Sequence, residues 1–228
     1  MQFQAGAPAE APRRRLWLRL GELVTGLVLW GLAIALMVRS ELGLGPWDAF
    51  HVGLHLQTGL SIGVANIATG TVIIAITLAM RVRPGVAIVL NTLLIGLCVD
   101  LFLPVVPAAP GVWPGLTYFA GALVIAGLAT GLYIGAGFGQ GPRDALMLAI
   151  HERTGWSVQR ARTVLEASVL AAGWAMGGGV GIGTVVYALA IGPAVQWGLR
   201  LFVKPTSSSA GDDSSSDPPG SRRFRRAA

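Results

Sequence analysis

The sequence predicts an all-α membrane protein with six transmembrane helices, arranged as two inverted three-span repeats, each with one short extra helix. Hydrophobic residues make up 53% of the 228 residues and charged residues 12%, which is about half the charge of a typical soluble domain. Long apolar runs broken by glycine fill the region between two charged tails, and the sequence matches itself at a constant offset. This composition excludes a soluble α/β enzyme, a nucleic-acid-binding module and a disulfide-bonded secreted domain.

Six segments are long and apolar enough to cross the hydrocarbon core of a bilayer, which takes about 20 helical residues. They are residues 18–38, 61–80, 85–105, 116–135, 157–176 and 184–203. Two further segments, 46–56 and 142–152, are too short to span. Each begins at Gly-Pro and ends near Thr-Gly, which is typical of a short helix with its own start and stop signals.

Lys and Arg are distributed unevenly over the expected loops. If the N-terminus is cytoplasmic, sixteen of the seventeen Lys and Arg residues face the cytoplasm and only Arg39 faces the outside. Cytoplasmic loops are enriched in these residues, so we expect both termini inside. The expected regions are a disordered tail (1–15), the first repeat (16–105), an external linker (106–115), the second repeat (116–204) and a disordered basic tail (205–228). The basic tail is interpreted as a lipid contact and not as a nucleic-acid site.

The sequence matches itself without a gap when it is shifted by 96 residues, from 20–102 onto 116–198. Leu-Gly-Leu-Gly-Pro-Trp-Asp-Ala at 42–49 falls on Phe-Gly-Gln-Gly-Pro-Arg-Asp-Ala at 138–145. Each copy holds three spans, and because three is odd, the second copy must enter the membrane from the opposite side. Inverted repeats of this kind are found in secondary transporters, with the substrate site at the repeat interface. The alternative is a duplication that only builds a stable bundle.

Each copy places a Gly-Pro pair and an aspartate at the start of its short helix. These residues are Gly45, Pro46 and Asp48 in the first copy, and Gly141, Pro142 and Asp144 in the second. One interpretation is capping, because an aspartate in the first turn complements the helix dipole and accepts free backbone N–H groups. The other is a re-entrant turn whose unwound backbone lines a cavity and whose amides meet an anion.

Glu166 lies midway along the fifth expected span, where insertion of a charged side chain costs about 2.5–3.5 kcal/mol. Such a residue should face the bundle interior with a partner, and Arg162 lies one helical turn earlier on the same face. The pair is either a structural link from this span to a neighbour or a gate or proton-coupling site. Asn91 and Asp100 on the third span are weaker candidates of the same kind.

Other motifs have structural interpretations. Gly127, Gly131, Gly135 and Gly139 recur every four residues, a spacing that permits close helix packing. Residues 177–184 resemble a phosphate-binding loop but lack its Gly-Lys-Ser/Thr ending, and are expected to form a turn capped by Thr184. No cluster of Cys or His would hold a metal, and no catalytic signature occurs, so we expect no metal, no cofactor and no enzymatic activity.

Several motifs follow one another in a familiar order: Glu-Leu-Gly-Leu-Gly-Pro-Trp-Asp-Ala-Phe-His at 41–51, Thr-Gly-Leu-Ser at 58–61, Gly-Pro-Arg-Asp at 141–144 and Gly-Ile-Gly-Thr at 181–184. Together with Asn91, Asp100, Arg162 and Glu166, they resemble the bacterial YczE-like membrane proteins, relatives of the YitT-type group. The resemblance covers residues 18–203 and implies a bacterial inner-membrane protein of unassigned activity.

The function that these observations favour is a secondary transporter or exporter of a small solute, with the Gly-Pro-x-Asp turns and the Arg162/Glu166 pair beside the pathway. The alternative is a non-transporting accessory protein that acts through a homo-oligomer or a protein partner. A transporter should show a hydrated cavity at the membrane midplane, lined by Glu166 and the Gly-Pro turns. An accessory protein should show these groups fully paired and buried, with a large apolar patch left facing lipid.

Overall fold

The computed structural model describes residues 15–81, 85–139 and 141–203, and in these ranges the regular structure is entirely helical. The predicted tails lie outside the described residues, apart from Arg15. The helices are α1 (Leu16–Ser40), α2 (Pro46–Thr58), α3 (Ile62–Ala79), α4 (Val86–Phe102), α5 (Val112–Gly135), α6 (Pro142–Thr154), α7 (Val158–Ala175) and α8 (Ile182–Phe202). The all-α prediction is confirmed, and each predicted segment corresponds to one helix.

Four helices, α1, α3, α5 and α8, are long and apolar enough to cross a membrane. Helix α4 is apolar but has only 17 residues. Helix α7 has 18 residues and carries Arg160, Arg162 and Glu166, which lower its mean hydropathy. The membrane character of the chain is therefore supported, whereas the count of six spans stays a prediction for α4 and α7.

The helices recur with the spacing of the sequence match. Helices α6 and α7 begin and end 96 residues after α2 and α3, and α5 and α8 begin 96 residues after α1 and α4. The same local signals act in both copies. Ser61 and Ser157 precede α3 and α7, and each side chain accepts a hydrogen bond from the backbone N–H three residues on, at 3.2 Å. Gly59 and Gly155 end α2 and α6 with φ of 74° and 70°, a conformation that glycine adopts without steric strain.

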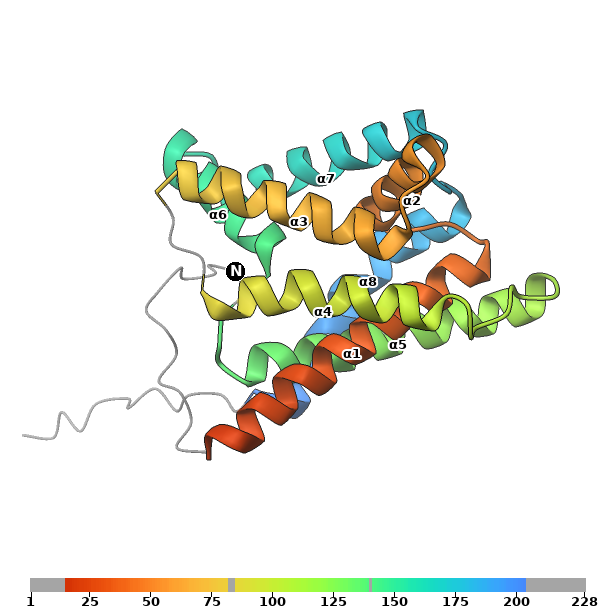
Figure 1. Ribbon diagram of the computed structural model, residues 1–228, viewed down its shortest axis with the longest axis horizontal. Coiled ribbons are helices and arrows are strands. Elements are labelled where there is room, and N and C mark those ends of the chain that lie inside the picture. Colours follow the sequence, from red (N-terminus) through yellow and green to blue (C-terminus); the bar gives the residue numbers. More distant parts are fainter. Residues whose placement is uncertain (1–14, 82–84, 140, 204–228) are drawn as a thin grey trace, which may run out of the picture.

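The helices form two groups (Figure 1). Helix α1 packs between α4 and α5, and α5 also packs on α8. In the other group, α2 packs on α7 and α3, and α6 on α3 and α7. The groups meet where α3 lies on α4 and where α6 approaches α4. The short helices therefore lie within the group that faces the inner side of the α1–α4–α5–α8 layer.

Small residues let the helices approach closely. A Cβ on Gly26 of α1 would lie 2.8 Å from the carbonyl oxygen of Ala129 on α5. On the far side of α5, a Cβ on Gly131 would meet the Gly198 carbonyl of α8. The predicted packing role of the glycine spacing in α5 is confirmed, except at Gly139, which follows the helix.

The predicted cap is confirmed as well, because Thr184 accepts a hydrogen bond from the Gly181 N–H at 3.2 Å.

Candidate functional site

The starts of the two short helices lie against matched partners from the other repeat. Gly45 precedes α2, and a Cβ added there would lie 2.8 Å from the ring of Tyr187 on α8. Gly141 precedes α6, and a Cβ there would lie 3.4 Å from the side chain of Asn91 on α4. Asn91 and Tyr187 are themselves 96 residues apart. Each Gly-Pro start therefore sits on a side chain of the opposite repeat, and Asn91 joins the site as predicted.

Asp48 is the most deeply buried carboxylate at these helix starts, with 2% of its surface exposed. Its Oδ1 atom has no hydrogen-bond partner in the described part of the chain. Burial raises the pKa of the Asp48 carboxyl above its ordinary value, and the nearby charge of Arg143 acts in the opposite direction. Asp48 lies in the first turn of α2, where its charge complements the helix dipole, so its capping role stays a prediction.

Asp144 occupies the matched position on α6 in a different environment. It is held by the backbone N–H of Gly141, as the capping interpretation predicts, and faces Arg162, Arg143 and Glu166. Burial raises the pKa of Asp144, while the two guanidinium groups and the hydrogen bond lower it. The two equivalent aspartates thus differ in their surroundings: the Asp144 carboxylate accepts a hydrogen bond from the Gly141 N–H, whereas Asp48 is more deeply buried and its Oδ1 atom has no partner among the described residues.

Arg143 connects the two helix starts. Its guanidinium carbon lies 4.9 Å from the centre of the Trp47 ring on α2, a cation–π geometry. The charge also acts on Asp48, Asp144 and the neighbouring His51. His51 is 2% exposed, and burial together with Arg143 lowers its pKa well below the ordinary value, so its ring is neutral at pH 7.

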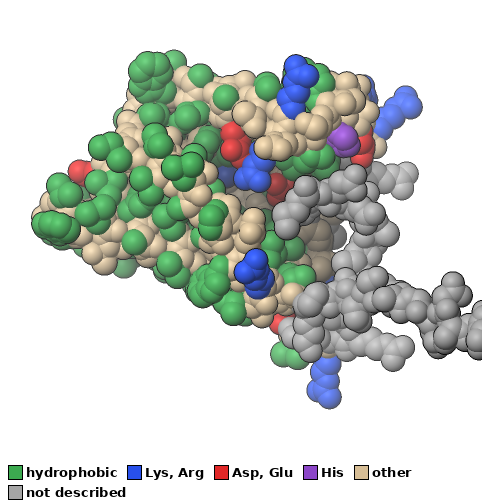
Figure 2. All heavy atoms as spheres, turned by 180° about the vertical axis from the view of Figure 1, so that it is seen from behind, with side chains coloured by type: hydrophobic (Ala, Val, Ile, Leu, Met, Phe, Trp, Pro, Cys, Tyr) green, Lys and Arg blue, Asp and Glu red, His purple; other side chains and the backbone are tan. Residues whose placement is uncertain are grey.

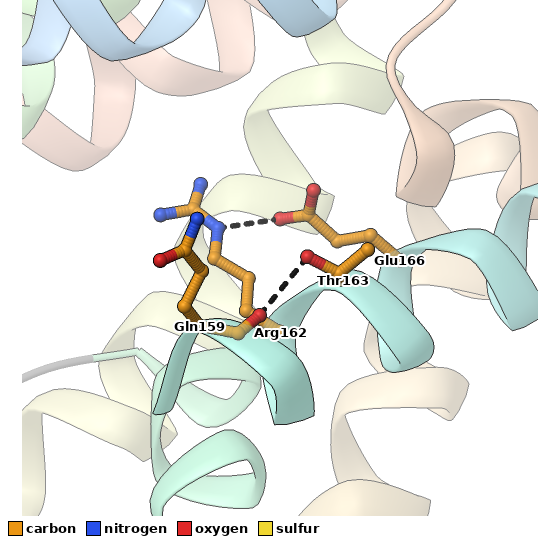
Figure 3. A network of polar contacts seen from close by, with 4 residues as sticks. All are labelled: Gln159, Arg162, Thr163 and Glu166. Atoms are coloured by element: carbon orange, nitrogen blue, oxygen red, sulfur yellow. Dashed lines mark hydrogen bonds and ion pairs between the residues drawn. The ribbon is translucent and has the colours of Figure 1, made fainter. Parts of the chain in front are cut away.

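Arg162 and Glu166 form an ion pair along α7 (Figure 3), with 2.9 Å between Nε and Oε1. The prediction that they share one helical face is confirmed. Their side chains are 58% and 38% exposed. The ion pair itself lies within α7, but the charge of Arg162 also acts on Asp144 of α6. Both interpretations of the pair, a structural link and a gate or proton-coupling site, stay predictions. Figure 2 shows acidic and basic side chains together in a hollow of the surface.

Asp100 does not join this cluster. It lies nine residues after Asn91 along α4, about 13 Å at 1.5 Å per residue. Its carboxylate accepts hydrogen bonds from Ser61 Oγ at 2.5 Å and from the backbone N–H of Gly63 at 2.8 Å. The carboxylate therefore meets the positive N-terminal end of α3 and fastens that helix to α4.

The cluster thus joins α2, α6 and α7, with α4 and α8 at its edge. Sequence reasoning missed Arg143, His51, Trp47 and Tyr187 as members. The signal for Arg143 was available, because it replaces Trp47 at a matched position of the repeat. The cluster holds three carboxylates and two guanidinium groups, so it offers both signs of charge. In the described residues, no three His, Cys, Asp or Glu side chains group in a way that could hold a metal ion.

Two apolar hollows lie away from this cluster. One follows α5 from Trp113 to Ile125. The other lies between the loop from Glu41 to Leu44 and the glycines from Gly179 to Gly181. Neither contains a charged residue of the cluster. Neither hollow is lined by Glu166 or by the Gly-Pro helix starts, so the midplane cavity expected of a transporter stays a prediction.

Comparison with known proteins gives a family without an assigned activity. Residues 17–200 match the family of unknown function DUF6198. The chain is 36% identical to the uncharacterized membrane protein YczE of Bacillus subtilis over 194 residues, covering 84% of this chain and 90% of the relative. It is 30% identical to an uncharacterized protein of Haemophilus influenzae over 182 residues, covering 80% and 84%. No solved structure matches the chain.

Proposed function

Because the chain belongs to DUF6198, a YczE-like family of membrane proteins, we propose that it is a secondary transporter or exporter of a small solute in the bacterial inner membrane. The observation that carries the proposal is the convergence of charged groups from both repeats at two helix starts. Inverted-repeat transporters bind their substrates where broken or short helices meet at the repeat interface. In this proposal the chain is not an enzyme and needs no cofactor.

The proposed topology has six spans, α1, α3, α4, α5, α7 and α8, in two inverted repeats with both termini in the cytoplasm. The uneven distribution of Lys and Arg supports it. Figure 2 shows the basic side chains of that face gathered toward one end of the long axis. In Figure 1, α2 and α6 lie toward opposite ends of the same axis, as two inverted copies require.

Helices α4 and α7 fit this topology for different reasons. The 17 residues of α4 reach about 26 Å at 1.5 Å per residue, close to the hydrocarbon thickness of about 30 Å. The charges of α7 are those expected of a span that lines a water-filled path, because intramembrane charged residues face such cavities or pair with each other.

The state of the polar groups favours transport over an accessory role. An accessory protein should pair its buried polar groups, because an unpaired buried group costs about 1–3 kcal/mol. Asp48 is buried, and its Oδ1 atom has no hydrogen-bond partner among the described residues. The side chains of Arg162 and Glu166 are 58% and 38% exposed. Their free hydrogen-bonding capacity is suited to a solute that carries both acceptors and donors. The accessory function stays the second candidate.

A thermal-shift screen of the detergent-purified protein against metabolites, drugs and ions tests the proposed function. A ligand at 100 times its dissociation constant should stabilise the fold by about 2.7 kcal/mol. We expect a stabilising ligand whose effect is lost in Glu166→Gln, which keeps the shape of the side chain but removes its charge. Glu152→Gln, at an exposed carboxylate of α6, is the matched control and should keep the effect. If the ligand still stabilises the Glu166→Gln variant, Glu166 is not part of the binding site.

The inverted topology is tested with a reporter enzyme that is active only outside the cytoplasm. Inserted after Thr58, at the end of α2, it should be active. Inserted after Thr154, at the matched end of α6, it should be inactive, because the second repeat is inverted. Insertion after Gly111, in the expected external linker, is the positive control. Equal activity at Thr58 and Thr154 would contradict the inverted arrangement.

A further inference from the structure

In the first repeat, helices α3 and α4 pack closely against each other. Helix α3 packs on α4 through glycine, so that a Cβ on Gly96 would lie 2.6 Å from the carbonyl oxygen of Gly63. Further along the same contact, a Cβ on Gly70 would lie 2.5 Å from the Thr92 side chain. All four residues are buried. Helices α3 and α4 therefore leave no room for a solute between them.

The matched pair of the second repeat is open. Helices α7 and α8 do not pack against each other as α3 and α4 do. The residues that correspond to the closed contact are Gln159, Glu166, Ala188 and Gly192. Nothing lies within 4 Å of a Cβ built on Gly192. The same positions of the repeat are thus buried in one copy and open in the other, and the Arg162–Glu166 pair lies on the open side.

The loops repeat this asymmetry. The Gly183 N–H, at the start of α8, donates to the Leu42 carbonyl at 2.8 Å, and the Leu44 N–H donates to the Gly179 carbonyl at 3.0 Å, so these bonds join the loop before α2 to the loop between α7 and α8. No bond equivalent to the first joins Phe138 and Ala87, the matched residues, in the described structure. Asp100 fastens α3 to α4, whereas the residue at its matched position, Gln196, is exposed.

We infer that the two repeats exchange these two packings during transport. In the opposite state, α7 packs on α8 as α3 packs on α4 here, and α3 separates from α4. This inference rests on the proposed function. In the proposed topology, the gap between α7 and α8 is the cytoplasmic entrance to the charged cluster, and the Asp100 contacts close the outer side. Because both copies share one sequence pattern, each can adopt the packing of the other.

The residues that line the gap between α7 and α8 indicate which kind of solute must bind before the two helices pack together. Helix α3 presents Gly63 and Gly70 to α4, but α7 presents Gln159 and Glu166 to the small residues of α8. Closing α7 on α8 without a solute would bury Arg162 and Glu166 in a low-dielectric contact, which costs several kcal/mol per ion. A small solute with an acceptor for Arg162 and a donor for Glu166 removes that penalty. Closure of the entrance therefore follows binding of a solute with both groups.

Distances between nitroxide spin labels on matched helix pairs test the inference without a known substrate. In a Cys98→Ala background, Ala68→Cys with Leu93→Cys reports α3–α4, and Val164→Cys with Leu189→Cys reports α7–α8 at the same repeat positions. These four sites are exposed, so labels fit. In the parent, we expect a short α3–α4 distance and a longer α7–α8 distance.

Gly96→Leu inserts a side chain between α3 and α4 and should lengthen that distance. If the repeats are coupled, the α7–α8 distance shifts at the same time to the value that the α3–α4 pair has in the parent. Adding Gly192→Leu should hold α7 and α8 apart and abolish that second shift. Gly121→Leu, on α5 with nothing within 4 Å of its Cβ, is the control and should change neither distance. If Gly96→Leu does not fold, Asp100→Ala is used for the same test. This variant removes the hydrogen bonds from Ser61 and from the Gly63 N–H that join α3 to α4.

An α7–α8 distance that stays at its parent value while α3 and α4 separate overturns the inference, since a gap covered by a second copy or by lipid would behave in that way. The outcome is distinguishable from failure of the proposed function. Reciprocal distance changes in a protein that moves no solute would contradict the transporter proposal alone. Measured transport with fixed label distances would contradict only the inferred motion.

Discussion

Replacing Arg143 by methionine should lower the free energy of unfolding by about 1–3 kcal/mol, the cost of leaving a buried polar group without compensation. Arg143 is the cation that acts on Asp48, which is 2% exposed and has no hydrogen bond to its Oδ1 atom. Without the guanidinium, the carboxylate is a buried charge with no compensation. The loss is limited because the carboxyl can take up a proton. Thermal unfolding in detergent measures it.

The second substitution Asp48→Asn separates charge from packing. In Arg143→Met/Asp48→Asn the uncompensated charge is gone, so most of the lost stability should return. Arg153→Met, at an exposed arginine on the same helix, should cost less than about 1 kcal/mol, the limit of a helix-dipole effect at an exposed site. If the double variant is as unstable as Arg143→Met, the stability came from stacking on Trp47 and the electrostatic explanation is wrong.

The helices could be predicted from the sequence because their signals are local. Gly-Pro begins α2 and α6, Thr-Gly ends them, and Ser61 and Ser157 begin α3 and α7 with the capping bonds that serine makes. The pairing of Arg162 with Glu166 was predictable for the same reason, since helical spacing alone brings them together.

The contacts of Asp100 could not be predicted, because they depend on tertiary structure. The N-terminal end of α3 that Asp100 contacts is distant in the sequence. The different surroundings of Asp48 and Asp144 could not be predicted from the sequence either. Their local motifs are nearly identical, whereas the side chains packed on the two helix starts differ, Tyr187 beside Gly45 and Asn91 beside Gly141.

The asymmetry between the repeats could not be predicted from the match either. Equivalent sequence positions predict equivalent packing, yet Gly96 is buried against Gly63 and Gly192 is open. Similar sequences that pack in two ways indicate that the two packings are close in free energy, as a bistable element requires. The repeat therefore predicts the helices but not which copy is closed.

The fixed part of the fold is the contact of α8 with α5, and Gly198→Leu should disrupt it. A Cβ on Gly198 would meet the Gly127 carbonyl group and lie 3.2 Å from the Leu128 nitrogen. These are backbone atoms of a helix and cannot rotate away, so α5 and α8 must separate. Overpacking costs about 1–3 kcal/mol where side chains yield and occasionally more. We expect a loss of about 3 kcal/mol or more, measured as a lower unfolding temperature in detergent.

Gly192→Leu is the matched control, because it places the same side chain on the same helix where nothing lies within 4 Å. It should unfold at the parent temperature even though it blocks closure of α7 on α8. The two glycines thus separate the contact that holds α8 in place from the face that α7 approaches in the inferred motion. If Gly198→Leu is tolerated as well as Gly192→Leu, α8 is not anchored on α5, and α8 cannot serve as the fixed surface against which α7 closes.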